Sequence, residues 1–339
     1  MNAYTRTGMS LIGAIALIPL AVPHPAGAAT EDHGPAAAGW TSRPPLHVGR
    51  VGAAAATVNG LIVETGGGAP DQDLPIESTE VRRTVGSGVW RFVADVPTPR
   101  ANAAAATLGG KVWVVGGYGE GELPVDVVER YDPRTNAWSR GPTLPEGRAQ
   151  AGAAVLHGVL YVVGGDITTA GRESITDTGL AFHPRQHRWI PIAPLPARRD
   201  RLRLIAAGDF LYAIGGEKAG FTSVSTVDRY DPGTGRWTSI AAMHETRSVP
   251  GATVVGHGRD ARIAVIGGCQ FIAGTRIQLR RTTEVFDPTT GRWRLLRAQL
   301  PTGRCSLTAA TEADGTILAI GGVVPTNRAT NAVDALRLR

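Results

Sequence analysis

The chain repeats itself with a period of about fifty residues. An apolar run ends in a Gly-Gly doublet at six places, and successive doublets lie 50, 48, 51, 52 and 54 residues apart. The second glycines of these doublets are Gly67, Gly117, Gly165, Gly216, Gly268 and Gly322. A regular repeat of this length indicates an array of similar supersecondary units. It therefore favours one repetitive domain, although 339 residues would also allow two unrelated ones.

Two further residues recur in step with the doublets. A tryptophan occurs once per period, at Trp40, Trp90, Trp138, Trp189, Trp237 and Trp293. An arginine follows each tryptophan after ten residues, or eleven in the last case, at Arg50, Arg100, Arg148, Arg199, Arg247 and Arg304. We call these six residues the ring arginines. Because three different residue types keep the same spacing, the similarity between the six periods does not arise by chance.

Each period contains the signals of four short strands. An aromatic residue lies seven residues before four of the tryptophans, at Tyr131, Phe182, Tyr230 and Phe286. Asp-Pro or His-Pro with polar residues separates the two aromatics, which predicts two strands joined by a tight turn. A strand of small residues after the ring arginine and the apolar run before the doublet supply the other two.

The period, the doublet, the Tyr/Phe-x-Pro turn and the tryptophan together resemble the kelch repeat from Trp40 to the C-terminus. The resemblance implies an all-β fold, a six-bladed β-propeller of four-stranded antiparallel blades. The sequence agrees with that shape, because the inner strand of small residues suits a crowded position near a central axis. Paired glycines would allow backbones to approach closely where blades meet.

The two ends of the array complement each other. The sixth unit stops after its third strand, at residues 333–339, whereas Trp40 precedes the first complete unit. We therefore expect the N-terminal strand around Trp40 to complete the last blade, which closes the ring and removes an open edge. The predicted propeller occupies residues 38–339.

Residues 1–28 have the pattern of a secretory signal peptide. Arg6 precedes an apolar stretch from Met9 to Val22, and Ala26-Gly27-Ala28 forms a small-residue cleavage site. The apolar stretch is 14 residues long, whereas a permanent membrane span needs about 20. We predict a signal peptide over 1–28, a linker over 29–37, a secreted or extracytoplasmic protein, and no membrane insertion after cleavage.

The two cysteines, Cys269 and Cys305, lie in the exported part. An even number of cysteines in that compartment favours a disulfide over two free thiols. Cys269 follows a doublet and Cys305 follows a ring arginine, so both are expected on one face of the fifth and sixth units.

The positive charge of the chain does not indicate a nucleic-acid partner. The formal net charge is +6, and all but two of the 35 basic residues are arginines spread along the sequence. Nucleic-acid binding usually needs a basic cluster on one face, and the chain has none interleaved with aromatic residues. We predict no nucleic acid as a partner.

The ring arginines and the loops after the doublets are expected on one face, which is commonly the binding face in kelch proteins. Guanidinium groups suit carboxylates, so the ring arginines are candidate contacts for an acidic ligand. The alternative is that they brace neighbouring loops through backbone carbonyls.

Departures from the repeat suggest further candidates. A strand period of two would place Arg199, Arg201 and Arg203 on one face along the axis, where they would contact an acidic or glycan ligand or line a water-filled channel. Glu217, in the loop after the fourth doublet, is a candidate acid or base. Glu64 occupies a slot that is apolar in the other units; it is either an acid or base, or the sign of an irregular first unit, which we favour.

Kelch propellers include copper radical oxidases and sialic-acid mutarotases. Only His47 and His244 approach the expected face, which is too few for a copper site of two histidines and two tyrosines, so we predict no metal and no cofactor. A mutarotase remains the alternative function. The sequence favours a binding module over an enzyme, with an acidic small molecule, a glycan or a protein partner at the arginine-rimmed face.

Overall fold

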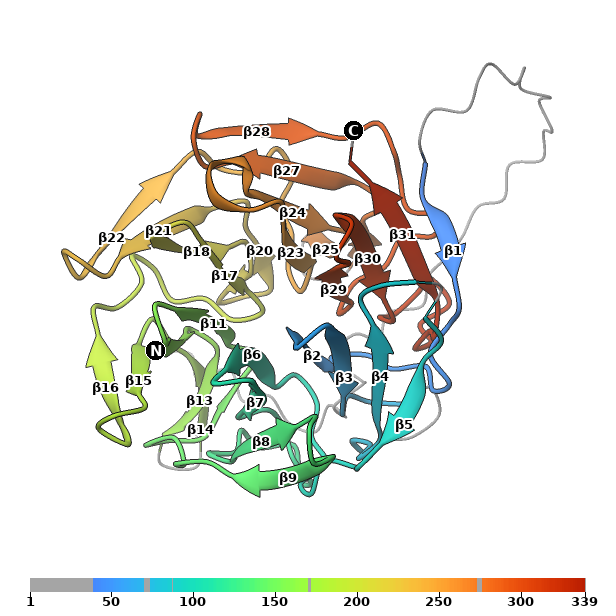
Figure 1. Ribbon diagram of the computed structural model, residues 1–339. Helices are drawn as coiled ribbons and strands as arrows, with labels where there is room; N and C mark the ends of the chain where they lie inside the picture. The colour runs from blue at the N-terminus through green and yellow to red at the C-terminus, as the bar shows by residue number, and fades with distance from the viewer. Residues whose placement is uncertain (1–38, 70–73, 87, 170–171, 273–275, 339) are drawn as a thin grey trace, which may run out of the picture.

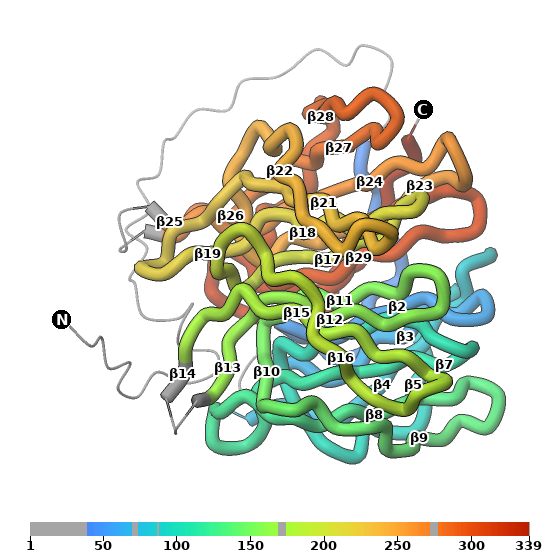
Figure 2. The backbone as a smooth tube through the Cα atoms, turned by 90° about the vertical axis from the view of Figure 1, so that its left-hand side faces the viewer, coloured from blue at the N-terminus to red at the C-terminus, as the bar shows by residue number. Residues whose placement is uncertain are grey.

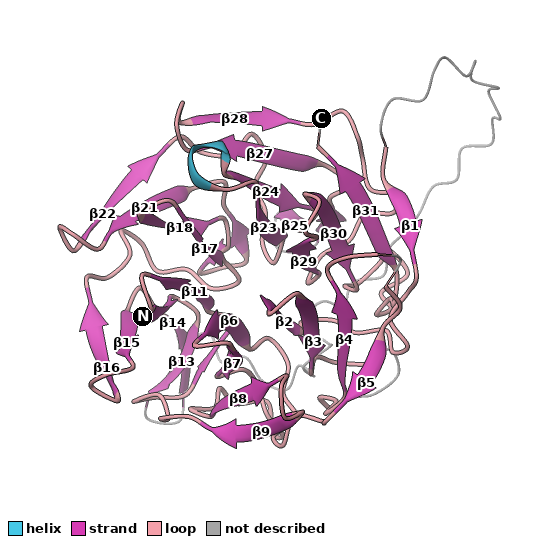
Figure 3. Cartoon of the chain, viewed as in Figure 1, coloured by secondary structure: helices cyan, strands magenta, loops and turns pink. Residues whose placement is uncertain are grey.

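The computed structural model describes residues 39–69, 74–86, 88–169, 172–272 and 276–338. The predicted signal peptide over 1–28 and the linker over 29–37 lie outside the described residues. Within these ranges the chain is almost entirely β-structure, with one short 3-10 helix at Gly258–Asp260 (Figure 3). No helix among the described residues is long and apolar enough to cross a membrane.

The described residues form six four-stranded antiparallel sheets arranged around a central axis (Figure 1). The first three sheets follow the repeat from the inner to the outer strand. The first contains β2 (Ala54–Val58), β3 (Leu61–Thr65), β4 (Thr79–Arg83) and β5 (Arg91–Val93). The second contains β6 (Ala104–Leu108), β7 (Lys111–Val115), β8 (Val128–Asp132) and β9 (Ala137–Arg140). The third contains β11 (Gly152–Leu156), β12 (Val159–Val163), β15 (Gly179–His183) and β16 (Arg188–Ile192).

The remaining sheets continue the same order. The fourth contains β17 (Arg203–Ala207), β18 (Phe210–Ile214), β21 (Val227–Asp231) and β22 (Arg236–Ile240). The fifth contains β23 (Gly251–Val255), β24 (Arg262–Ile266), β27 (Thr283–Asp287) and β28 (Arg292–Leu295). The sixth contains β29 (Thr308–Thr311), β30 (Thr316–Ile320), β31 (Val333–Arg337) and, as its outer strand, β1 (Thr41–Arg43).

The sixth sheet is completed by the two ends of the chain, as predicted. β1 pairs antiparallel with β31, with Thr41 opposite Ala335 and Arg43 opposite Val333. Trp40 packs beside this pairing against the apolar cluster between the fifth and sixth sheets, which contains Leu296 and Leu336. The N-terminal strand therefore closes the ring and covers the edge that β31 would otherwise expose.

The Gly-Gly doublets join neighbouring sheets. The second glycine of each doublet donates its N–H to the carbonyl of the next ring arginine at 2.8 to 3.0 Å, and the sixth doublet reaches Arg50, which completes a circle. Both glycines of every doublet have positive φ, and a Cβ added to Gly116 would lie 1.9 Å from the Arg148 carbonyl oxygen. Only glycine fits this close approach, because other residues are strained in this conformation.

The recurring aromatics pack as cross-strand pairs between the third and outer strands. Tyr131 lies opposite Trp138, with ring centroids 5.3 Å apart, and the same pairing recurs at Phe182–Trp189, Tyr230–Trp237 and Phe286–Trp293. In these four sheets the tryptophan Nε1 also donates to a carbonyl of the preceding sheet at 2.8 to 3.0 Å. This bond ties neighbouring sheets together at the periphery of the ring.

Three additional hairpins extend the loops that follow the doublets. In the third unit, β13 (Asp166–Thr169) pairs with β14 (Arg172–Ile175) on one side and with β10 (Arg148–Ala149) on the other. β19 (Glu217–Lys218) and β20 (Thr222–Ser223) belong to the fourth unit, and β25 (Cys269–Ile272) and β26 (Arg276–Leu279) to the fifth. Figure 2 shows β13, β14, β19, β25 and β26 on one face of the ring, which we call the mouth.

Candidate binding site at the mouth

A closed circle of backbone hydrogen bonds lies around the axis below the mouth. It is formed by the residues two positions after each ring arginine, Gly52, Asn102, Gln150, Arg201, Val249 and Ser306. All six have positive φ, and each N–H donates to the carbonyl of the corresponding residue in the preceding unit at 2.7 to 3.0 Å. We call this circle the peptide ring. It encircles the axis at the base of the mouth hairpins.

The ring arginines brace their own sheets. None is more than 2% exposed. Five of them donate to the carbonyl of the first glycine of their own doublet at 2.7 to 3.2 Å, and Arg100 donates instead to Val114. The same five guanidiniums also donate to the carbonyl of the residue before the third strand. Each guanidinium therefore ties the end of the second strand to the start of the third.

Every ring arginine also pairs with a buried or half-buried carboxylate. The pairs are Arg50–Glu80 at 2.9 Å, Arg100–Glu129 at 2.6 Å, Arg148–Glu146 at 2.7 Å, Arg199–Asp228, Arg247–Glu284 at 3.1 Å and Arg304–Asp334 at 2.6 Å. Burial lowers the pKa of Arg100, and the charge of Glu129 partly opposes that shift. These buried hydrogen bonds and ion pairs favour the second interpretation given in the sequence analysis, that the six residues brace the fold.

Sequence analysis missed these carboxylates, although a signal was present. In five units the second residue of the third strand is acidic, namely Glu80, Glu129, Asp228, Glu284 and Asp334. The third unit has Leu180 there, and Arg148 uses Glu146 instead. The variable loop length between doublet and third strand hides the pattern.

His47 and His244 take part in the same bracing. Each Nδ1 lies 2.8 Å from the glutamate that pairs with the ring arginine three residues later, Glu80 and Glu284 respectively. Burial pushes the pKa of Glu80 upward, but hydrogen bonds from His47 and the charge of Arg50 outweigh it and lower the pKa. The described residues contain no cluster of three or more His, Cys, Asp or Glu side chains suited to a metal ion.

Arg199, Arg201 and Arg203 do not share one face, contrary to the prediction. β17 begins only at Arg203, and Arg201 has a φ of 55°. The left-handed backbone at Arg201 interrupts the strand alternation on which the prediction rested. As a result Arg199 braces its sheet, Arg201 points into the mouth cluster, and Arg203 lies below the peptide ring.

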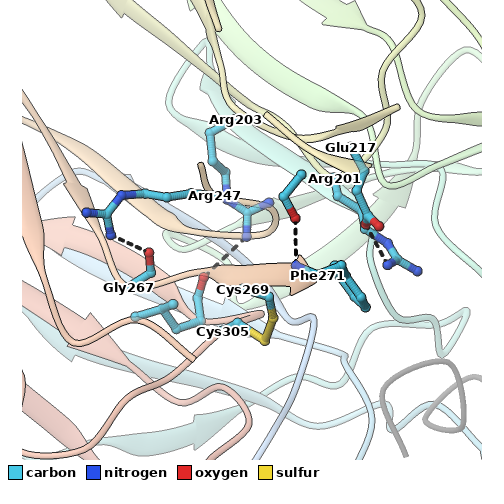
Figure 4. The surroundings of a disulfide bond; sticks show 10 residues. Arg201, Arg203, Glu217, Arg247, Gly267, Cys269, Phe271 and Cys305 are labelled. Atoms are coloured by element: carbon cyan, nitrogen blue, oxygen red, sulfur yellow. Dashed lines mark hydrogen bonds and ion pairs between the residues drawn. A yellow bond between two sulfur atoms is a disulfide. The ribbon is translucent and has the colours of Figure 1, made fainter. Parts of the chain in front are cut away.

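Arg201 is the centre of a polar cluster above the peptide ring. Its Nη1 donates to Glu217 at 2.7 Å, its Nε donates to the side-chain oxygen of Gln150 at 2.8 Å, and its guanidinium lies 5.8 Å from the Phe271 ring (Figure 4). Burial alone would lower the pKa of Arg201, but the carboxylates of Glu217, Asp200 and Asp166 outweigh it and raise the pKa.

A tyrosine and further carboxylates complete this cluster. The Tyr118 hydroxyl donates to Asp166 at 2.5 Å. Tyr118, Asp166 and Glu217 each directly follow a doublet, so the repeat places them in one layer of the mouth. With Asp200, the cluster contains three carboxylates and the single guanidinium of Arg201, all no more than 5% exposed. Glu217 therefore lies where the sequence predicted, but its charge is paired with Arg201.

An apolar cluster around the disulfide lies next to the Arg201 cluster. Cys269 and Cys305 form the predicted disulfide between the fifth and sixth units and are fully buried with Val249 and Val323 (Figure 4). Phe271, two residues after Cys269, has its ring centroid 5.9 Å from that of Phe221, and its N–H donates to the Ser223 hydroxyl. The hairpins of the fourth and fifth units therefore form one wall of the mouth.

Below the peptide ring, Arg203 and Glu64 occupy the axis. Arg203 donates to the carbonyls of Pro250 at 2.6 Å and Leu307 at 3.2 Å, which connects the fourth sheet to the fifth and sixth. Burial lowers the pKa of Arg203 to about 10, and the charge of Glu64 opposes that shift. These bonds to the protein explain Arg203 without a ligand.

Glu64 is an ordered part of the first sheet. β3 pairs in regular register, with Glu64 opposite Ala55 and Glu80, so the favoured interpretation of an irregular first unit is wrong. The side chain is 1% exposed and accepts hydrogen bonds from the Thr308 hydroxyl at 2.8 and 2.9 Å. Burial raises its pKa to about 8, against the opposing charge of Arg50.

Comparisons with known proteins agree with this architecture. The family model described as the Attractin/LZTR1 beta-propeller matches residues 112–335. Kelch-like protein 35 of Mus musculus is 28% identical over 218 residues, which cover 64% of this chain and 34% of that protein. Kelch-like protein 25 of Xenopus tropicalis is 29% identical over 206 residues, covering 59% and 33%. The chain thus matches about a third of the length of these relatives.

A solved structure shows the same fold. The structure of YjhT superimposes with a TM-score of 0.75 at 18% sequence identity, covering 88% of this chain and 97% of that one. At this level of identity the likeness concerns the fold alone. It leaves the chemistry of the mouth to be argued from the residues of this chain.

Proposed function

The chain belongs to the kelch-repeat β-propeller family, and from that premise we propose that it is a binding module whose ligand occupies the mouth. One observation carries the proposal. The hairpins of the third to fifth units stand on one face around the Arg201 cluster, above the peptide ring. Concave sites with a few convergent polar groups beside aromatic side chains are typical of ligand binding.

The chemistry of the mouth favours a glycan over an acidic ligand. Each ring arginine is paired with a carboxylate, and the mouth cluster gathers the carboxylates of Asp166, Asp200 and Glu217 around Arg201. These carboxylates would repel an anionic ligand. Carboxylates accept hydrogen bonds from hydroxyl groups, and the rings of Phe221 and Phe271 offer apolar surface for a sugar face. We therefore retain the glycan part of the sequence prediction and abandon the acidic part.

A paired glycan screen tests this proposal. The full chain is applied to neutral and sialylated or uronic-acid glycans on one array, and each hit is titrated with Glu217→Gln, Phe271→Ala and the control Asp209→Asn. Asp209 is an exposed carboxylate in the β17–β18 turn. We expect neutral hits that weaken roughly tenfold in Glu217→Gln, the effect of one weakened charged hydrogen bond. They should also weaken in Phe271→Ala, which removes the aromatic surface, but not in the control. Exclusively acidic hits, or equal affinities in all variants, would contradict it.

A mutarotase is the second candidate function. It is supported by the Tyr118–Asp166 hydrogen bond and by Glu217 in the same layer, since these groups could transfer protons to a bound sugar. Following anomer exchange of sialic acid by NMR tests it. Faster exchange that disappears in Tyr118→Phe would establish the activity, and an unchanged rate would remove it.

We further propose an extracytoplasmic location. The support is the signal-like sequence of residues 1–28 together with the Cys269–Cys305 disulfide, because such bonds persist in oxidising compartments. Expression with and without residues 1–28 tests it. The proposal expects the full-length chain in the extracytoplasmic fraction and the shortened chain in the cytoplasm, and equal distribution would contradict it.

A further inference from the structure

A groove lies at the periphery of the ring, where the fifth and sixth sheets meet. Its volume is about 370 Å³, and it is lined by residues 294–298 on one side and 336–338 on the other. These residues belong to β28 and the segment after it, and to the C-terminal end of β31. The two ends lie side by side near the C-terminus in Figure 1. We call this feature the seam groove.

The seam groove has an apolar floor and a cationic rim. Leu296 and Leu336 belong to the buried cluster between the two sheets, and Leu295 is 43% exposed. Arg294, Arg297 and Arg337 form the rim, and no lining residue is acidic.

The rim charges are available to a partner. Among the described residues, neither Arg294 nor Arg297 forms an ion pair. Arg337 reaches only Asp314, at 3.9 Å, and both side chains are mostly exposed. An exposed pair of this kind contributes little. The groove therefore presents three guanidiniums whose charges are not neutralised inside it.

An unpaired indole N–H lies at the same seam. The other tryptophan bonds between sheets reach a carbonyl four residues after the preceding tryptophan, as in Trp293 to Ala241. The same rule would direct Trp40 to the Arg297 carbonyl. Instead, the Trp40 Nε1 is buried with no acceptor among the described residues, and Trp90 on the other side of the sixth sheet shares this state. The segment from Trp293 to Arg304 is also one residue longer than its counterparts.

The fold itself does not require the rim arginines. The positions equivalent to Arg294 and Arg297 carry no charge in the second, third and fourth sheets, where the pairs are Ser139 and Pro142, Ile190 and Ala193, and Thr238 and Ala241. Charged residues can protect an outer strand against edge-to-edge association. β9, β16 and β22 carry their arginines at other positions, Arg140, Arg188 and Arg236. The first sheet has Arg91 at the position of Arg294 but Ala94 at that of Arg297. The fifth sheet is therefore distinguished by having arginine at both positions.

We propose that the seam groove binds an extended segment of a partner polypeptide in which acidic and apolar residues alternate. The charged side chains of the groove are three guanidiniums, so its partner must supply carboxylates. β28 is the outermost strand of its sheet, and an extended segment can pair along such an edge. Alternation then directs apolar side chains to the leucine floor and acidic ones to the rim.

The test uses a fluorescein-labelled (Glu-Leu)4 peptide and the full chain in fluorescence anisotropy. We expect saturable binding that weakens with salt, because rim charges are screened. Arg294→Glu/Arg297→Glu should weaken it roughly tenfold or more, since like charges then face the peptide. Arg185→Glu/Arg236→Glu is the matched control, with the same charge change on exposed residues of other sheets, and should leave the affinity unchanged. Equal affinity in both double variants would overturn the proposal.

Three other outcomes would also overturn it. Equal binding of (Lys-Leu)4 would remove the charge preference, and equal binding of (Glu-Ser)4 would remove the apolar one. Sedimentation with phosphatidylglycerol vesicles in the absence of peptide binding would assign the rim to a membrane. Tighter peptide binding by Glu31→Gln/Asp32→Asn would identify the segment of the chain that contains these two acidic residues as the occupant of the groove. The mouth is not involved in any of these measurements, so they are independent of the proposed function.

Discussion

Replacing Glu64 by glutamine should remove a pH-dependent weakness from the ring. Glu64 is buried beside Thr308, and burial raises its pKa from 4.5 to about 8. Below pH 4.5 the carboxyl is protonated in both the folded and the unfolded chain, so it does not affect stability differentially. Between pH 4.5 and 8 the unfolded chain releases this proton and the folded chain keeps it. The folded state is therefore progressively penalised as the pH rises.

The magnitude follows from the size of the shift. Each unit of pKa corresponds to about 1.4 kcal/mol, so the penalty reaches about 2 kcal/mol at pH 6 and about 5 kcal/mol above pH 8. Glutamine keeps the acceptor for the Thr308 hydroxyl and does not ionise. The unfolding free energy of Glu64→Gln should thus equal that of the wild type at pH 4.5. Above that pH the variant should be more stable than the wild type, by a margin that grows up to pH 9. The charges that face this carboxyl, Arg50, Glu80 and Arg203, remain in both proteins.

Urea unfolding at pH 4.5, 6, 7.5 and 9 measures this difference. Because other groups also titrate, only the difference between variant and wild type is interpreted. Glu77→Gln is the control, since it makes the same substitution at an exposed glutamate of the first unit. A Glu64→Gln difference that stays constant from pH 4.5 to 9 would refute the assignment of a protonated buried carboxyl.

Three further predictions concern the devices that hold the ring together. Gly116→Ala should lower the unfolding free energy by roughly 3 kcal/mol or more, because its Cβ would lie 1.9 Å from the Arg148 carbonyl oxygen. Gly121→Ala, also at positive φ but in open space, should lower it by only about 1 kcal/mol. Equal losses in the two variants would contradict this. Arg100→Ala should cost about 3 to 5 kcal/mol by leaving Glu129 buried and unpaired, and a chemical unfolding curve superimposable on the wild type would contradict the bracing role. Cys269→Ser/Cys305→Ser should lower stability by about 4 kcal/mol, as expected for a closed loop of 36 residues, and an unchanged thermal midpoint would argue against the bond.

The repeat made much of the fold predictable. The spacing of doublets, tryptophans and ring arginines gave the strands, the closure of the last sheet at Trp40 and the neighbouring positions of Cys269 and Cys305. These features depend on residues close together in the sequence, whose pattern recurs from unit to unit. The doublets also revealed their role, because no other residue fits two successive positive φ angles in such close contact.

The candidate site was less accessible to sequence reasoning. The pattern gave the position of Arg201 but not its left-handed backbone, which alone decides that it leaves the line of Arg199 and Arg203. The ring arginines could equally bind or brace. Five of their carboxylate partners follow 29 to 37 residues later, whereas the partner of Arg148 precedes it by two residues. The role of Glu64 depends on Thr308, 244 positions away. Contacts across closed sheets cannot be obtained from local spacing.

Hydrogen–deuterium exchange with and without the tightest glycan of the screen tests the central claim most directly. The claim is that the mouth above the peptide ring is the binding surface and that the ring arginines are internal braces. We predict protection confined to β19–β20, β25–β26 and the Arg201 segment, lost in Glu217→Gln. Protection of the outer strands or the opposite face, with the mouth unchanged, would contradict the account.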